Sequence, residues 1–421
     1  MALISQQGKF VLPDAYFGCS HGHIAPLALE SNSVSGQVAD WSRVETGMTV
    51  TKYSPNENKL TLSNGKELSY KALVIAPGFD HRDDLIEGLP EMRALPESEK
   101  VFVHKLDNKE TNDKNYYHGW DHVTGDMLCY APKGPYKGEG TDFWALYYES
   151  FLRQDKLQGR ASAGAKIQFW TPNKEIYRFP YANEVAMDEC HKRGIEVMFG
   201  WELKKVHMNE HGQKMGTFVN VDSGETLARP FSHMNINPPS AARQELVEAG
   251  ITDHTGLIDV NPFTLQHSRF ENIFAWGDAI KGETTRTQHA AYAQCPVVKH
   301  NLGQFMDGKE LNGVYDGFSY MPFYMSHSHA STFQHTWNYE PAPKNHWVPS
   351  FGLFAQAYFG NQMKGNLGVG KKYSGLDKNH GPPHNHFSPI YDPLDKNEYL
   401  AAKGIDVEAL RNVHAKSEVA V

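Results

Sequence analysis

The segment of residues 272–302 constrains the fold of this chain most strongly. An apolar run that predicts a buried strand leads directly into Gly277-Asp278, and a short loop and a helix-like segment follow. Such an arrangement can hold a nucleotide cofactor, because the carboxylate accepts hydrogen bonds from sugar hydroxyls and the helix N-terminus offers unpaired N–H groups. Asp278 can equally be a turn residue that caps the next helix, so the rest of the chain has to decide between the two.

The composition is that of an ordinary globular protein. A length of 421 residues is enough for two or three domains with sizeable cores. The net charge of −8 argues against nucleic acid as the main partner. No apolar run reaches the ~18 residues of a membrane-spanning helix. The first ten residues resemble neither a secretory signal nor an Arg-rich presequence, so either the mature protein starts here or the true start lies elsewhere.

The first part of the chain has the pattern of strands. Residues 48–70 alternate with a period of two, and Asn64-Gly65 is a strong hairpin signal, so a small antiparallel sheet is expected. An apolar run follows and ends in Ala76-Pro77-Gly78. Continuous apolar strands are typical of sheets that are buried on both faces, which is the expectation for this run.

Residues 126–199 predict a doubly wound nucleotide-binding unit. Strands are expected at 127–131, 166–170 and 195–199, and helices at 141–157 and 181–193, with Gly194 ending the second helix. The loop between the first strand and the first helix, residues 132–140, is rich in glycine. It could bind a pyrophosphate, but it does not have the GxGxxG pattern, and packing against the helix is an equal alternative.

In this order the motifs resemble one known family. The segments VIAPG, APKGPYKGEG, INPP and TLQHSRFENIFAWGD are similar to those of the sulfide:quinone oxidoreductases and of the flavoprotein subunit of flavocytochrome c sulfide dehydrogenase. Both are two-domain flavoproteins of the pyridine nucleotide-disulfide oxidoreductase superfamily. The resemblance covers residues 2–324 and implies an α/β fold with two dinucleotide-binding (Rossmann-like) domains, the first of them incomplete here, plus a C-terminal extension.

The resemblance also implies a site for FAD, which in that family takes electrons from sulfide and passes them to a quinone or a haem. Ala76, Pro77 and Gly78 would lie along the cofactor, and Gly277 and Asp278 would bind its ribityl chain and pyrophosphate. The helix that starts near Thr287 would point at the isoalloxazine. NAD(P) is not expected.

The beginning of the chain departs from the family pattern. The first strand and the GxGxxG loop that cradles the FAD pyrophosphate have no counterpart, and the chain is expected to begin at the second strand, residues 2–4. The acidic residue expected at the end of that strand is replaced by Ser5, Gln6 and Gln7. Three explanations follow: a longer real protein, a separate chain that supplies the missing strand and helix, or a fold rebuilt without them that has lost flavin binding.

The cysteines depart from the family pattern as well. The family's two reactive cysteines are expected in the loop after Tyr130 and near residues 318–322, and neither segment contains one. Sulfide oxidation needs a thiolate beside the flavin and a second sulfur to hold the product. No catalytic residue is therefore assigned. Cys129 remains a candidate nucleophile, and a buried structural thiol is the alternative. Cys190 and Cys295 lie in helical patterns and are expected to be packed. Cys19 and the other three cysteines form no CxxC or metal-finger spacing.

The last quarter of the chain is rich in histidine and aromatic residues. The segment from Trp347 to Phe359 contains four aromatic residues at helical spacing: Trp347, Phe351, Phe354 and Tyr358. They could form part of the core, an interface with a partner or a contact with the membrane surface. Loop histidines without cysteine or carboxylate at ligand spacing are more often solvent-facing than metal ligands, so no metal is expected. The histidines considered were His327, His329, His380, His384 and His386.

These observations predict four parts and one main function. The parts are a first section of the FAD-type domain at 1–95, a second dinucleotide-binding-like domain at 96–230, the remainder of the FAD-type domain at 231–308 and the extension at 309–421. The chain is expected to be a catalytically degenerate sulfide:quinone oxidoreductase-like protein, a pseudoenzyme. It would be an accessory subunit of a larger respiratory-type assembly at the mitochondrial inner membrane, with other protein subunits as its partners.

Two alternatives remain open. One is an active FAD-dependent oxidoreductase whose N-terminal segment is missing here or supplied by another chain. The other is a nucleotide sensor that uses only the second unit.

Overall fold

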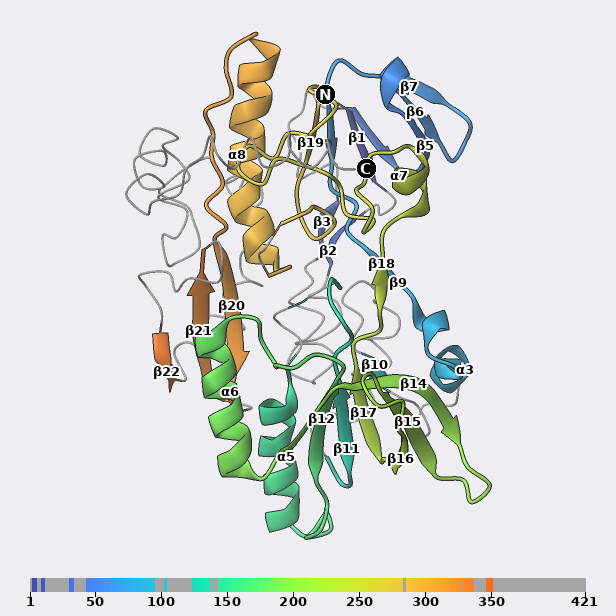
Figure 1. Cartoon of the computed structure of the whole chain (residues 1–421), viewed down its shortest axis with the longest axis vertical. Helices are drawn as coiled ribbons and strands as arrows, with labels where there is room; N and C mark the ends of the chain where they lie inside the picture. Colours follow the sequence, from blue (N-terminus) through green and yellow to red (C-terminus); the bar gives the residue numbers. More distant parts are fainter. Residues whose placement is uncertain are drawn as a thin grey trace.

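The computed structural model describes residues 2–5, 9–11, 30–33, 43–94, 102–103, 123–136, 139, 143–282, 285–326, 328–336 and 346–350. Figure 1 shows two α/β units along the long axis of the molecule, with the orange strands of the C-terminal part beside them. No helix among the described residues is long and apolar enough to cross a membrane.

The first unit is built from parallel strand pairs and a small antiparallel sheet. β1 (Ala2–Ser5) runs parallel to β4 (Arg43–Thr46), and β8 (Leu73–Ile75) runs parallel to β19 (Ile273–Ala275). The expected antiparallel sheet is present as β5 (Val50–Ser54), β6 (Lys59–Leu62) and β7 (Glu67–Ser69). The other elements of the first unit are β2 (Lys9–Val11), β3 (Glu30–Ser33), the 3-10 turn Pro55–Glu57, α7 (Gln244–Glu248) and α8 (Gln288–Met306).

The expectation of a strand buried on both faces is wrong for β8. The strand is only three residues long, and Val74 in its middle is 37% exposed. Within the described residues β8 pairs only with β19, so one face of Val74 meets solvent while Ile75 packs into the core of this unit. The apolar run therefore predicts correctly that one face of β8 is buried, but not that both faces are.

The second unit contains a five-stranded parallel sheet. The strand order is β10 (Phe102–Val103), β17 (His233–Ile236), β11 (Met127–Tyr130), β12 (Ile167–Thr171) and β13 (Glu196–Phe199). Because successive side chains of a strand point to opposite faces, Met127 and Cys129 enter one core cluster and Leu128 and Tyr130 enter another. The sheet includes β17, which lies beyond the boundary proposed at residue 230.

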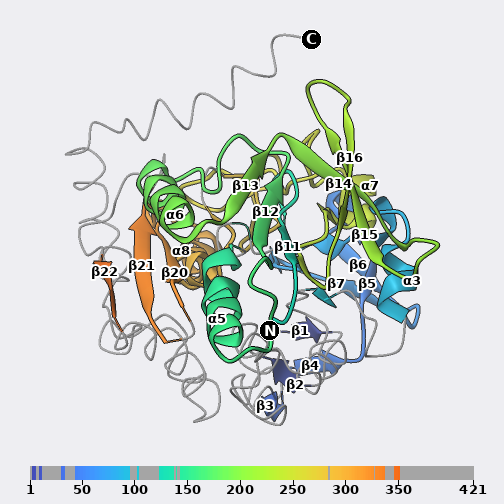
Figure 2. The same ribbon diagram turned by 90° about the horizontal axis from the view of Figure 1, so that it is seen from below.

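Different elements cover the two faces of this sheet, as Figure 2 shows. One face carries α5 (Ala145–Leu157) and α6 (Pro180–Arg193), which ends at Gly194 in the left-handed conformation as expected (φ 68°). The other carries a three-stranded antiparallel sheet that the sequence analysis missed. Its strands are β14 (Trp201–Met208), β15 (Lys214–Asn220) and β16 (Thr226–Pro230). Short elements that join the two units are β9 (Asp80–His81), the 3-10 turn Asp83–Leu85, α3 (Leu89–Ala94) and β18 (Ser240–Ala241).

The helix expected at 141–157 begins later than predicted. Trp144 precedes α5 with non-helical backbone angles (φ −107°, ψ 1°), and its ring stacks on Tyr324 with the ring centroids 4.9 Å apart. Phe143 likewise stacks on Phe323. Phe143 and Trp144 were included in the predicted helix because they fit its apolar spacing. In the structure they pack against the C-terminal strands and lie before the helix begins.

The C-terminal extension joins the core of the second unit. β20 (Ser319–Tyr324), β21 (Ala330–His335) and β22 (His346–Ser350) form an antiparallel sheet, and Met321 and Phe333 belong to the same core cluster as α5 and α6. Trp347 lies in β22, so the helical spacing expected to start there is wrong at that residue: pairing with β21 decides the backbone instead. Phe351, Phe354 and Tyr358 lie outside the described residues.

Candidate functional site

The residues assigned to a cofactor meet at one edge of the first unit. Because β8 and β19 are parallel neighbours, their carboxyl ends place residues 76–78 beside Gly277 and Asp278, and the Trp276 backbone N–H donates to the Ile75 carbonyl (3.2 Å). Thr287 is the N-cap of α8, and its hydroxyl accepts from the Ala290 N–H (3.0 Å). We call the set Ala76, Pro77, Gly78, Gly277, Asp278 and Thr287 the strand-end site.

The protein itself uses the polar groups of the strand-end site. The Gly277 N–H donates to the buried amide oxygen of Gln294 (2.7 Å), and the Asp278 carbonyl accepts from Nε of Arg286 (2.9 Å). The remaining cavity, lined by residues from Gly277 to Gln294, is about 10 Å³, which is room for about one water molecule. Ligand pockets usually measure about 300–1,000 Å³. The cavity between the described residues is therefore much smaller than an isoalloxazine ring system requires.

The side chain of Arg286 is one of those that line this cavity. Its exposed fraction is 8%, and its guanidinium carbon lies 5.8 Å from the ring centroid of Phe79, the residue after Gly78. Nη1 donates to Oε2 of Glu139 (2.8 Å), and the Arg286 backbone N–H donates to the Glu139 carbonyl (3.0 Å). Arg178 approaches the other carboxylate oxygen of Glu139 (3.5 Å). The glycine-rich loop of the second unit thus contacts the first unit through a charged residue.

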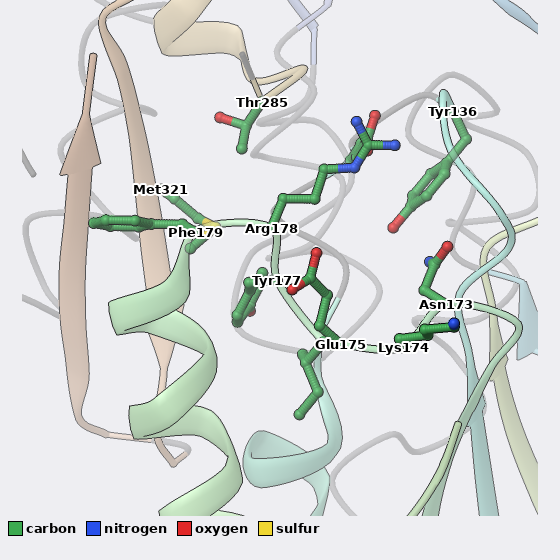
Figure 3. A pocket seen from close by; sticks show the side chains of 11 residues that line it. Tyr136, Asn173, Lys174, Glu175, Tyr177, Arg178, Phe179, Thr285 and Met321 are labelled. Atoms are coloured by element: carbon green, nitrogen blue, oxygen red, sulfur yellow. The ribbon is translucent and has the colours of Figure 1, made fainter. Parts of the chain in front are cut away.

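A second cavity, about 130 Å³ in volume, lies beside this contact (Figure 3). Tyr136 and Met321 both line it, so the structure brings together the two segments in which the reactive cysteines of the family were expected. None of the described lining residues carries a thiol. The lining residues are Tyr136, Glu139, Asn173, Lys174, Glu175, Ile176, Tyr177, Arg178, Phe179, Thr285 and Met321.

The described cysteines are protonated thiols. Cys129 lies in β11 with none of its surface exposed, and burial raises the pKa of its thiol far above the usual range, with a smaller contribution from Cys190. Burial also raises the pKa of Cys190 in α6 to about 12, and that of Cys295 in α8 to about 12. The thiolate is the reactive form of cysteine, so none of the three is poised for nucleophilic attack.

A buried chain of hydroxyl groups ends at a histidine that the sequence analysis did not single out. Ser319 Oγ lies 2.8 Å from Thr287 Oγ1 and 2.5 Å from Thr285 Oγ1, which lies 3.0 Å from His335 Nε2. The other ring nitrogen, Nδ1, lies 3.0 Å from the Thr336 carbonyl and must donate to it. Burial lowers the pKa of His335 to about 4, so the ring is neutral and Nε2 accepts from Thr285.

Of these residues the sequence analysis singled out only Thr287; Thr285, Ser319 and His335 carried no signal in the sequence. A threonine or serine at the start of a helix or strand is common, and only the register of β20 and β21 brings Ser319 opposite His335. The low basicity of His335 makes it a poor general base, so the chain of hydroxyls is a structural link between α8 and the C-terminal strands.

Metal-binding geometry is not found in the part of the chain that the structure describes, where no group of three or more histidine, cysteine or acidic residues could hold a metal ion. His329 is exposed and contacts the Ser328 hydroxyl (3.0 Å). The other four candidate histidines lie outside the described residues.

The fold defines a class of protein: a mixed α/β chain with the Rossmann-like architecture seen in FAD/NAD(P)-binding oxidoreductases. No protein-family profile matches the chain. Its curated relatives are mitochondrial sulfide:quinone oxidoreductases, so the predicted relationship is confirmed. The enzyme of Schizosaccharomyces pombe is 26% identical over 312 residues, which are 73% of this chain and 64% of that enzyme. The chain thus matches a little under two thirds of that relative's length.

Two solved structures share the fold. A chain in the cryo-EM structure of the Tetrahymena thermophila mitochondrial ATP synthase is 24% identical and superposes with a TM-score of 0.75, covering 89% of this chain and 88% of that one. The sulfide:quinone oxidoreductase of Aquifex aeolicus is 15% identical with a TM-score of 0.67, covering 88% of this chain and 85% of that one. This chain therefore shares its α/β fold with each of these two proteins along most of its length.

Proposed function

We propose that this chain is a catalytically degenerate relative of the sulfide:quinone oxidoreductases, a pseudoenzyme that serves as an accessory subunit of a larger mitochondrial assembly at the inner membrane. The 130 Å³ cavity is the observation that carries the proposal. It lies between the two segments where the family's reactive cysteines belong, and tyrosine and methionine line it there. Neither side chain can form a disulfide or a persulfide.

The strand-end site supports the same conclusion. Its backbone groups are engaged by Gln294 and Arg286, and the remaining space is far smaller than a tricyclic ring system requires. The surrounding elements are nevertheless intact, with the glycines after β8 and β19 in left-handed conformations (φ 68° and 86°). An intact scaffold with a closed site fits a protein that is retained for its shape and its contacts.

The ATP synthase structure indicates which assembly to test. A chain of that multi-subunit complex has this fold along nearly its whole length, and the curated relatives are mitochondrial enzymes. We therefore propose that the partners of this chain are subunits of a mitochondrial ATP synthase-type complex. Residues 347–359 remain the proposed contact with a partner or with the membrane surface.

The proposal is tested with the native complex. The epitope-tagged chain is isolated from mitochondria in mild detergent and run on a native gel, and co-migrating proteins are identified by mass spectrometry. We expect co-migration with ATP synthase subunits. Migration as a free monomer in every detergent tested would contradict the accessory role.

The chemistry is tested separately on the same preparation. We expect no quinone reduction on addition of sulfide, under conditions in which the Schizosaccharomyces pombe enzyme is active. Sulfide-dependent quinone reduction together with bound flavin would instead establish the alternative, an active FAD-dependent oxidoreductase whose remaining FAD-binding segment comes from outside the described residues or from another chain.

A further inference from the structure

The contact between Arg286 and Glu139 lies where the two units of the chain meet. Arg286 directly precedes Thr287 of the strand-end site in the first unit, and Glu139 lies in the glycine-rich loop of the second unit, 147 positions away in the sequence. Two hydrogen bonds connect the same two residues, one between the backbones (3.0 Å) and one between the side chains (2.8 Å). We call this contact the Arg286–Glu139 bridge.

The guanidinium of Arg286 also contacts both strand ends of the first unit. Nε donates to the carbonyl of Asp278, which follows β19, and the cation lies over the ring of Phe79, which follows β8. A planar, positively charged group thus contacts Asp278 of the strand-end site and Phe79, the residue that follows Gly78. What remains beside it has a volume of about 10 Å³.

The surroundings are built for this pair of charges. The side chains of Arg286 and Glu139 are 8% and 12% exposed. A Cβ atom on Gly134 would lie 2.6 Å from Oε1 of Glu139, so a larger residue there would displace the carboxylate. Arg178 faces that same oxygen. A buried charge is costly without its partner, so the loop is held in place whenever the two units are assembled.

We infer that the Arg286–Glu139 bridge is a built-in substitute for a bound ring system. It closes the strand-end site from within and fixes the loop of the second unit against the first. This inference rests on the proposed function, because it explains how a site of this kind stays ordered without a cofactor.

A double-mutant cycle on the full-length chain tests the bridge. Arg286→Met keeps an apolar side chain of similar length, and Glu139→Gln keeps the shape of the carboxylate. We expect each single substitution to lower the midpoint of thermal unfolding by several degrees, and the double substitution to lower it by much less than the sum of the two. Additive effects of the two substitutions would overturn the inference.

A matched control comes from an exposed ion pair. Lys309 and Asp307 lie 2.9 Å apart with side chains 61% and 60% exposed. Lys309→Met and Asp307→Asn should change the midpoint little, singly or together, because exposed pairs contribute little to stability. The comparison separates coupling through burial from a general effect of removing charges.

Flavin retention gives a second readout, and its first measurement uses the wild-type chain alone. The wild-type chain is incubated with FAD and separated from free FAD by gel filtration. We expect the wild-type chain to retain no FAD. Arg286→Met should retain at least as much FAD as the wild type. Stoichiometric retention by the wild type that is lost in Arg286→Met would show instead that Arg286 binds the cofactor.

The two proposals fail in different ways. A chain that co-migrates with an assembly and lacks sulfide oxidation, but shows additive substitutions, refutes the bridge alone. A chain with strongly coupled substitutions that migrates as a monomer refutes the accessory role alone.

Discussion

Cys129 and Cys190 belong to the same core cluster of the second unit, between the parallel sheet and the helices that cover it. Neither is more than 1% exposed, and burial holds the pKa of both thiols well above neutrality. A sequence supplies the identity of a cysteine but not its environment, and the environment decides the fraction of thiolate. For Cys129 the buried environment favours the structural thiol over the nucleophile.

Alkylation measures this directly. In a Cys19→Ser background, which removes a cysteine outside the described residues, we expect iodoacetamide at pH 8 to leave Cys129 and Cys190 unmodified in the native chain and to modify both after unfolding. A cysteine introduced at the exposed position Ser223 should react quickly and serves as the control. Rapid native modification of Cys129, read by peptide mass spectrometry, would restore it as a candidate nucleophile.

Among the secondary-structure elements, α8 is connected to the C-terminal strands by buried hydroxyl groups. The hydroxyls of Thr285 and Thr287 lie at the start of α8, and they contact Ser319 of β20 and His335 of β21. Each member is buried and hydrogen-bonded, so the chain of hydroxyls fixes the helix relative to the strands. The extension is thereby joined to both units, because β20 and β21 also pack into the core of the second unit.

A pH dependence of stability follows from His335. Burial lowers its pKa in the folded protein to about 4, whereas an unfolded histidine has a pKa of about 6.5. Between these values the unfolded state binds a proton that the folded state does not, so stability is lost as the pH falls from about 6.5 to about 4. We expect the unfolding midpoint to fall over this range.

The variant His335→Gln keeps a polar side chain at the end of the chain of hydroxyls but cannot titrate. It should show a shallower dependence of the midpoint on pH than the wild type, measured by thermal unfolding at intervals between pH 4 and 7. His211, whose side chain is 74% exposed, provides the control, since His211→Gln should leave the slope unchanged. A slope that His335→Gln does not alter would show that other groups cause the effect.

At the scale of the whole molecule, local patterns predicted the α/β architecture because each element carries its own signal. The Asn64-Gly65 hairpin and the Gly194 helix end are both decided by a few neighbouring residues. Predictions were wrong where distant packing decides. Trp144 leaves the helical pattern to stack on Tyr324, and Trp347 pairs into a sheet.

The site was predictable only in part for the same reason. Gly78 and Gly277 follow apolar strands, and the parallel pairing of those strands brings them together. No sequence motif predicts the pairing of Arg286 with Glu139, because it depends on how the two units pack together. Sequence patterns thus located the scaffold of the site, and the structure supplied the side chains that fill it.

The burial of the Arg286–Glu139 bridge has a consequence for the history of such a chain. Removing one member of a buried ion pair costs about 3–5 kcal/mol, a large part of the roughly 5–15 kcal/mol that stabilises a typical domain. Neither residue can therefore be replaced alone without a heavy penalty, and a tolerated change at this contact requires both residues to change together. The pair is thus an epistatic constraint on how the sequence can vary at positions 139 and 286.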